Sequence, residues 1–205
     1  NMADGDGGDD TLRFDLSGAT GDLNINLNAY SNWDGSVQFW ADAQDYSNGN
    51  LPAHVNAYGF EHFEVTGGQG NDTINGSIAS ETLNGGEGDD HLYGGMGQDV
   101  LTGGTGHDCF TYSQLSEGGA DEWITDFMLG MNGDLLDLGG FYSNHPGFVV
   151  DAQHVSFSHI DSNNDGSTDY TQVGVDVDGG GDNFLTLVNL QGVEMTLGNW
   201  ENLLA

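Results

Sequence analysis

A nine-residue repeat fills residues 67–111 of this 205-residue chain. Written in blocks, it reads GGQGNDTIN, GSIASETLN, GGEGDDHLY, GGMGQDVLT and GGTGHDCFT, and the register never slips. Every sixth position is acidic and every eighth is large and apolar, which constrains the segment to a repetitive structure with a regular core. The acids are Asp72, Glu81, Asp90, Asp99 and Asp108, and the apolar residues are Ile74, Leu83, Leu92, Leu101 and Phe110.

The chemistry of each block favours calcium. Glycine permits the positive φ angles of a tight turn and lets carbonyl oxygens converge, because it has no Cβ. An acidic sixth residue then adds a hard oxygen ligand, which is the kind that Ca²⁺ prefers. The last three residues of a block predict a short strand with one inward side chain. The glycines expected to shape the metal-binding turns are Gly68, Gly70, Gly86, Gly88, Gly95, Gly97, Gly104 and Gly106.

The pattern G-G-x-G-x-D-x-U-x resembles the calcium-binding nonapeptide repeat of RTX proteins. The resemblance implies an all-β fold: a calcium-bound, right-handed parallel β-roll, or β-solenoid, with two blocks per turn, capped by flanking β-strands. It implies one apolar column of Ile74, Leu92 and Phe110 facing Leu83 and Leu101, and ligand pairs from blocks two apart. Those pairs are Asp72 with Asp90, Asp90 with Asp108, and Glu81 with Asp99. A flexible glycine-rich linker is the alternative, but linkers do not keep acidic and apolar phases over five blocks.

The second block, GSIASE, lacks two of the three glycines, and we expect incomplete metal occupancy there.

The charge of the chain points to cations as partners. There are 33 acidic residues, a single basic residue, Arg13, and a formal net charge of -32. Salt bridges therefore cannot neutralise the protein, and this charge argues against affinity for nucleic acid or anionic membranes. Bound divalent cations are the natural counter-charge, although solubility or adaptation to salt also explains an acidic surface. Cys109 is the only cysteine, so no disulfide staples the chain.

Residues 1–66 are predicted to form a β-rich flank. The flank opens on a degenerate repeat, GDGGDDTLR, with Asp10 and Leu12 in the sixth and eighth positions, so we expect the chain to continue upstream. Alternating patterns at 23–27 and 37–39 predict strands. The aromatic residues of this flank, among them Trp33 and Trp40, are either a packed core, which we favour, or a sugar-stacking platform.

Residues 112–205 are predicted to form a capping region. The motifs ITDF (124–127) and GDLLDL (133–138) resemble the carboxy-terminal target region of type I secreted proteins, with two extra residues between the motifs. The resemblance makes Asp126, Asp134 and Asp137 candidate ligands of a calcium at the end of the roll. The ending NFLTLVNLQGVEMTLGNWENLLA resembles an uncleaved type I export signal, the alternative being a docked terminal strand or helical turn.

A second type of calcium loop is suggested at 161–169, between strands predicted at 155–157 and 173–177. Asp161, Asn163, Asp165 and Asp169 match positions one, three, five and nine of an EF-hand loop. Gln172 stands where the bidentate glutamate belongs, and an ordinary hairpin turn fits equally well.

No catalytic motif is present, and we expect a non-catalytic protein. The resemblance to RTX and type I secreted proteins implies a monomeric module for calcium-dependent folding and type I secretion, binding several Ca²⁺ ions, from the carboxy-terminal end of a large extracellular RTX adhesin of a Gram-negative bacterium. Its expected partners are calcium and the type I apparatus, with a glycan or cell-surface partner left open. The alternatives are an accessory module of a secreted protease or alginate epimerase, or a glycan-binding module.

Overall fold

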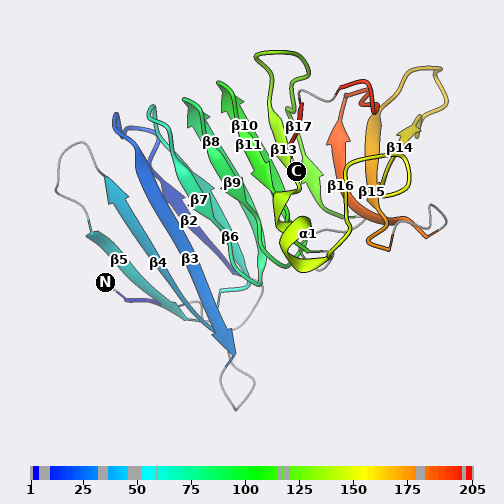
Figure 1. Ribbon diagram of the computed structural model, residues 1–205. Helices are drawn as coiled ribbons and strands as arrows, with labels where there is room; N and C mark the ends of the chain where they lie inside the picture. The colour runs from blue at the N-terminus through cyan, green and yellow to red at the C-terminus, as the bar shows by residue number, and fades with distance from the viewer. Residues whose placement is uncertain are drawn as a thin grey trace.

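The fold is built almost entirely from strands. The computed structural model describes residues 2–4, 10–31, 37–45, 52–58, 60–114, 117, 121–178, 183–199 and 202–204. Their strands form two sheets that pack against each other (Figure 1). The one α-helix described, α1 (Gly139–Asn144), has six residues, and none of the described helical segments could cross a membrane.

The two sheets contain nine and eight strands. In spatial order, the nine-stranded sheet contains β1 (Met2–Asp4), β5 (Pro52–Tyr58), β4 (Val37–Asp45), β3 (Leu23–Ser31), β7 (Thr73–Asn75), β9 (His91–Tyr93), β11 (Cys109–Thr111), β13 (Leu135–Asp137) and β17 (Leu203–Leu204). The eight-stranded sheet contains, listed from the opposite end of the stack, β14 (Val155–Ile160), β15 (Tyr170–Val175), β16 (Leu185–Gln191), β12 (Trp123–Ile124), β10 (Val100–Thr105), β8 (Ser80–Glu87), β6 (His62–Thr66) and β2 (Thr11–Asp15).

Successive repeat blocks send their strands to opposite sheets. Blocks one, three and five form β7, β9 and β11, while blocks two and four form β8 and β10. Strands two blocks apart pair in parallel, with Ile74 opposite Leu92 and Leu83 opposite Leu101. A nine-residue period therefore places each eighth-position side chain directly above the one 18 residues earlier, as the sequence predicts.

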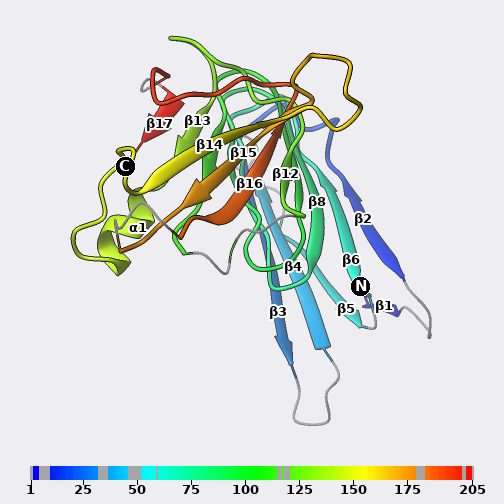
Figure 2. The ribbon, with the colours of Figure 1, turned by 90° about the vertical axis from the view of Figure 1, so that its right-hand side faces the viewer.

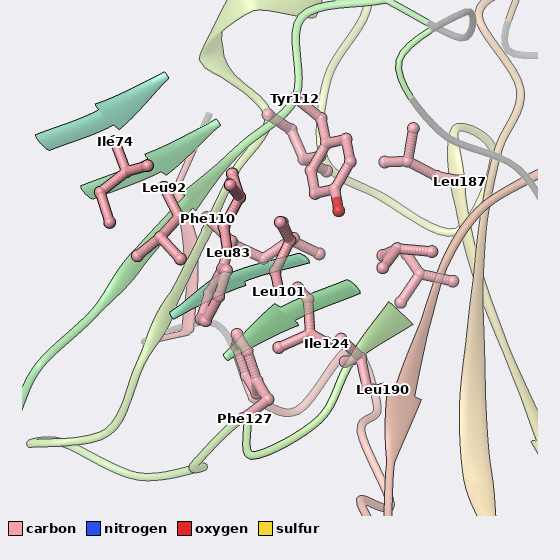
Figure 3. Packing of buried hydrophobic residues seen from close by; sticks show 14 of the residues in the cluster. Ile74, Leu83, Leu92, Leu101, Phe110, Tyr112, Ile124, Phe127, Leu187 and Leu190 are labelled. Carbon is pink, nitrogen blue, oxygen red and sulfur yellow. The ribbon is translucent and has the colours of Figure 1, made fainter. Parts of the chain in front are cut away.

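The apolar columns continue beyond the repeats. In the nine-stranded sheet the register adds Ile25 before Ile74, and Leu136 and Leu203 after Phe110. In the other sheet it adds Val65 before Leu83, and Ile124 and Leu190 after Leu101. All of these side chains are buried, and Figure 3 shows the two columns meeting between the sheets. The described parts of the flanks thus extend the repeat core.

Each sheet contains one antiparallel group near one of its ends, whereas β1 pairs with β5, β2 with β6, and β13 with β17 in parallel. β3, β4 and β5 pair antiparallel at one end, and β14, β15 and β16 do so at the other. Figure 2 shows the second of these groups, β14 to β16, on the side that faces the viewer. The all-β prediction is confirmed, but the sheets are mixed, so a closed solenoid that is parallel throughout does not describe these residues. Parallel stacking continues past the repeats as far as β3 in one sheet and β16 in the other, and hairpins replace it beyond those strands.

The predicted strands outside the repeats are present as β3, β4, β14, β15 and β16. The degenerate repeat at the amino-terminal end puts Leu12 in the eighth position, which forms the core column in the other blocks. In the structure Phe14, not Leu12, lies opposite Val65 and continues that column. Leu12 instead lies opposite Phe63.

A short terminal strand docks on the stack. β17 pairs with β13, and the Asn202 side chain before it is fully buried. Its Nδ2 donates to the carbonyl oxygen of Asp134 at 2.7 Å, and its Oδ1 accepts from the amide of Gly130 at 3.0 Å. This is the docked strand that the sequence left as one alternative, whereas the resemblance to an export signal stays a prediction.

Candidate metal centre

Three acids of the repeats form a column along one edge of the stack. Asp72, Asp90 and Asp108 each end a glycine-rich turn just before a strand of the nine-stranded sheet. The amide of Asp72 donates to Oδ1 of Asp90 at 2.7 Å, and the amide of Asp90 donates to Oδ1 of Asp108 at 2.9 Å. All three side chains are at most 2% exposed. One turn after another therefore presents a buried carboxylate at the same place.

A second column runs along the opposite edge. The amide of Glu81 donates to Oδ1 of Asp99 at 2.7 Å, and both side chains are buried. In the Glu81 turn, Ser77 replaces glycine, and its Oγ donates to Oε1 of Glu81 at 2.5 Å. The Glu81 carboxylate is therefore partly satisfied by its own turn, and the incomplete metal occupancy expected for this block stays a prediction.

Two carboxylate oxygens in these columns lack a hydrogen-bond partner among the described residues. They are Oδ2 of Asp90 and Oδ2 of Asp99, and both are buried. Each points at the glycine that opens its own turn, because a Cβ on Gly85 would overlap Oδ2 of Asp90 and one on Gly94 would lie 2.5 Å from Oδ2 of Asp99. A buried anionic oxygen without a donor is costly, so each position calls for a cation or a proton.

The glycine turns bring carbonyl oxygens together. A Cβ on Gly104 would overlap the carbonyl oxygen of Gly86, so neighbouring turns approach more closely than any side chain would allow. In the first block, the amide of Gly68 donates to Oδ2 of Asp72 at 2.6 Å, and Gly70 packs against residues 21–22. Six repeat glycines have φ between +99° and +146°: Gly86, Gly88, Gly95, Gly97, Gly104 and Gly106.

Burial shifts the protonation of the acids. Desolvation, followed by repulsion from neighbouring carboxylates, raises the pKa of Asp90 to about 7 and that of Asp108 to about 6. The pKa values of Glu81 and Asp99 are also raised, chiefly by desolvation. The only arginine, Arg13, pairs with Glu64 at 2.6 Å on an exposed part of the surface. No lysine or second arginine exists to neutralise the columns.

The donor set fits calcium. All the groups are hard oxygens, namely buried carboxylates and convergent main-chain carbonyls. Among the described residues, no three side chains of His, Cys, Asp or Glu converge as a metal-binding group. Carboxylates alone are therefore insufficient, and the carbonyls of the glycine turns would have to complete the coordination.

Of the three acids predicted after the repeats, two approach the turns. Asp134 continues the first column, since its Oδ1 accepts from the amide of Asp108 at 3.0 Å. Asp126 accepts from the amides of Gly103 and Gly104 at 2.9 and 2.8 Å. Asp137 lies apart, where its Oδ1 accepts from the amide of Gly139 at 2.7 Å.

Glu122 occupies an acid position that the sequence reasoning missed. It is 1% exposed, and its Oε2 accepts from the amide of Asp99 at 2.9 Å, so it continues the second column. The signal was a triplet of acid, any residue and apolar residue: Glu122-Trp123-Ile124 repeats the spacing of Asp99-Val100-Leu101. It was overlooked because the segment before it, 112–121, does not follow the block pattern.

The loop at 161–169 connects the hairpin of β14 and β15. Its acidic side chains bind the loop's own donors: Asp161 accepts from the amides of Asp165 and Gly166, and Asp169 from Ser162. Oδ1 of Asn163 accepts from the amide of Asp165 at 2.9 Å. These contacts suffice for the turn, and metal binding in this loop remains an untested prediction.

The two tryptophans considered for a sugar platform lie in the amino-terminal flank. Trp33 lies outside the described residues, and Trp40 is described only as part of β4. Sugar binding by this flank therefore stays a prediction.

The comparisons with known proteins identify the repeat segment. The family description of the RTX calcium-binding nonapeptide repeat, in four copies, matches residues 64–79 and 75–108. A search of curated proteins found no match to the chain. The matched residues contain all five buried acids of the repeat blocks, from Asp72 to Asp108, together with their glycine turns. Residues 64–108 are therefore RTX calcium-binding nonapeptide repeats.

Proposed function

We propose that this chain is a calcium-dependent folding module in which the repeats form a calcium-loaded β-roll. The observation that carries the proposal is the pair of buried carboxylate columns in a chain of net charge -32 with one arginine and no lysine. Burying an unpaired carboxylate costs several kcal/mol even after relaxation. When bound, calcium would supply the positive charge that the side chains of the protein lack.

The residues that would hold calcium are the column acids and the carbonyls of the glycine turns. At about 1 mM calcium and a dissociation constant of about 0.1 mM, each site would stabilise the folded chain by about 1.4 kcal/mol. Because the turns share the stacked acids and the apolar columns, loss of one turn weakens its neighbours. Folding would therefore respond to calcium as a cooperative switch.

The role that we propose for this switch is export and display. A chain kept unfolded by self-repulsion at low cytosolic calcium would thread through a type I exporter and fold outside the cell. The motifs at 124–127 and 133–138 support this route. The sequence GFEHFEVTGGQGND at 59–72 resembles the segment that precedes the repeats in large RTX adhesins, which supports such an adhesin as the parent protein. The absence of catalytic motifs from the sequence supports a non-catalytic module.

Far-ultraviolet circular dichroism tests the proposal. Treatment with a chelator should remove β-sheet signal, and added calcium should restore it. Magnesium at the same concentration should fail, because it demands smaller, octahedral sites and sheds water reluctantly. If magnesium restores the signal as well as calcium does, general charge screening rather than coordination explains the folding.

A further inference from the structure

We infer that Asp99 and Glu122 hold a calcium ion outside the nonapeptide pattern, at the carboxy-terminal end of the second column. This site rests on the proposed function, because it uses the same stack. It differs from the repeat sites in that one acid comes from residues 112–122, which do not match the block pattern.

The strand register places Glu122 on Asp99 as Asp99 lies on Glu81. Val100 pairs with Thr82 on one side and with Trp123 on the other. The residues that precede these three, Glu81, Asp99 and Glu122, therefore stack in that order. The hydrogen bonds repeat as well. The amide of Glu81 donates to Asp99 at 2.7 Å, and the amide of Asp99 donates to Glu122 at 2.9 Å. Glu122 is thus the third acid of the second column.

The local charge requires a cation or a proton. Asp99 is 0% exposed and Glu122 is 1% exposed, and Oδ2 of Asp99 has no hydrogen-bond partner among the described residues. Tyr112 donates its hydroxyl to Oε1 of Glu122 at 3.1 Å, which adds a dipole but no charge. Arg13 lies on β2, four strands away from β12 in the sheet. Two adjacent buried carboxylates without a positive side chain supply anionic hard oxygens that a divalent ion would neutralise, and main-chain carbonyls would complete its coordination.

The column ends in an apolar residue on each side. Trp123 pairs with Asn189, so Val188, the residue before Asn189, takes the next place in the column beyond Glu122. At the other end, Phe63 lies opposite Glu81. Both apolar residues are fully buried or nearly so, which makes Asp99 and Glu122 the last acid pair on this edge.

Glu117 provides a matched control in the same segment. It is equally buried, at 1% exposure, but its two oxygens accept from four donors. These are the hydroxyl of Tyr93 at 2.9 Å, the amide and Oγ of Ser113 at 2.5 and 2.6 Å, and the amide of Gln114 at 3.1 Å. Such a carboxylate is satisfied by the protein itself and needs no metal.

Native mass spectrometry of the calcium-saturated chain tests the inference. Relative to the wild type, Glu122→Gln should bind one calcium ion fewer, while Glu117→Gln should bind the same number. An unchanged count for Glu122→Gln would overturn the inference. A wild type that binds no calcium at all would instead overturn the proposed function.

A second measurement does not depend on the folding of a variant. Crystals of the calcium-loaded wild type should show an anomalous scattering peak within about 2.3–2.6 Å of a Glu122 carboxylate oxygen. An ordered Glu122 without such a peak would also overturn the inference.

Discussion

Replacing Asp90 with Asn should have opposite effects with and without calcium. Asp90 is the middle acid of the first column, with Asp72 donating to it and its own amide donating to Asp108. It would therefore serve two neighbouring calcium sites. At about 1.4 kcal/mol for each site near 1 mM calcium, Asp90→Asn should lower the free energy of unfolding by about 3 kcal/mol. Without calcium the same change removes a buried charge, so the variant should be as stable as the wild type or more so.

Asp89→Asn is the matched control. Asp89 neighbours Asp90 and loses the same charge, but it is exposed and its Oδ1 accepts from the amide of His107 at 2.9 Å. Denaturant unfolding should be measured for both variants at 1 mM calcium, and their residual β-sheet signal in chelator should be compared with that of the wild type. The reasoning is refuted if Asp90→Asn has less residual signal than the wild type in chelator, or if it loses no more stability than Asp89→Asn does in calcium.

Protonation, core packing and turn geometry each provide one further test. Because burial raises the carboxyl pKa of Asp90 from 3.8 to about 7, the folded metal-free chain binds more protons than the unfolded chain. The stability of the metal-free chain should therefore fall as pH rises from about 4 to 7. Potentiometric titration should show that calcium affinity falls as pH is lowered through the same range, because protons compete with calcium for the carboxylate. Leu92→Ala, at a fully buried position, should cost about 2–5 kcal/mol in calcium-saturated denaturant unfolding, and a cost below about 1 kcal/mol would argue against a continuous core. Gly85→Ala should weaken calcium-induced folding, followed by circular dichroism, because its Cβ would overlap an oxygen of Asp90, whereas Gly18→Ala meets no atom within 4 Å and should have little effect.

The repeat period predicts the middle of this protein because one physical rule governs it. With the two blocks per layer that the RTX resemblance implies, residues 18 apart must coincide, so the pairing of Ile74 with Leu92 and of Asp72 with Asp90 follows from that geometry and the spacing. No tertiary information beyond the family geometry is needed there.

Outside the repeats, spacing no longer determines the register. Ile25 and Leu136 extend one column from segments separated from the blocks by loops of other lengths, and only the pairing of their strands reveals it. Glu122 was missed for the same reason, since the stack tolerates an irregular loop provided that the acid and the apolar residue keep their separation of two. The antiparallel ends depend on hairpins, which the nine-residue pattern does not encode.

The most direct test of the account is the metal content of the folded protein at pH 7. Native mass spectrometry and circular dichroism should be recorded on the same samples during a calcium titration. The account predicts that β-sheet signal and bound calcium increase together and that the chelated chain lacks both. A fully folded, metal-free chain at pH 7 would contradict it.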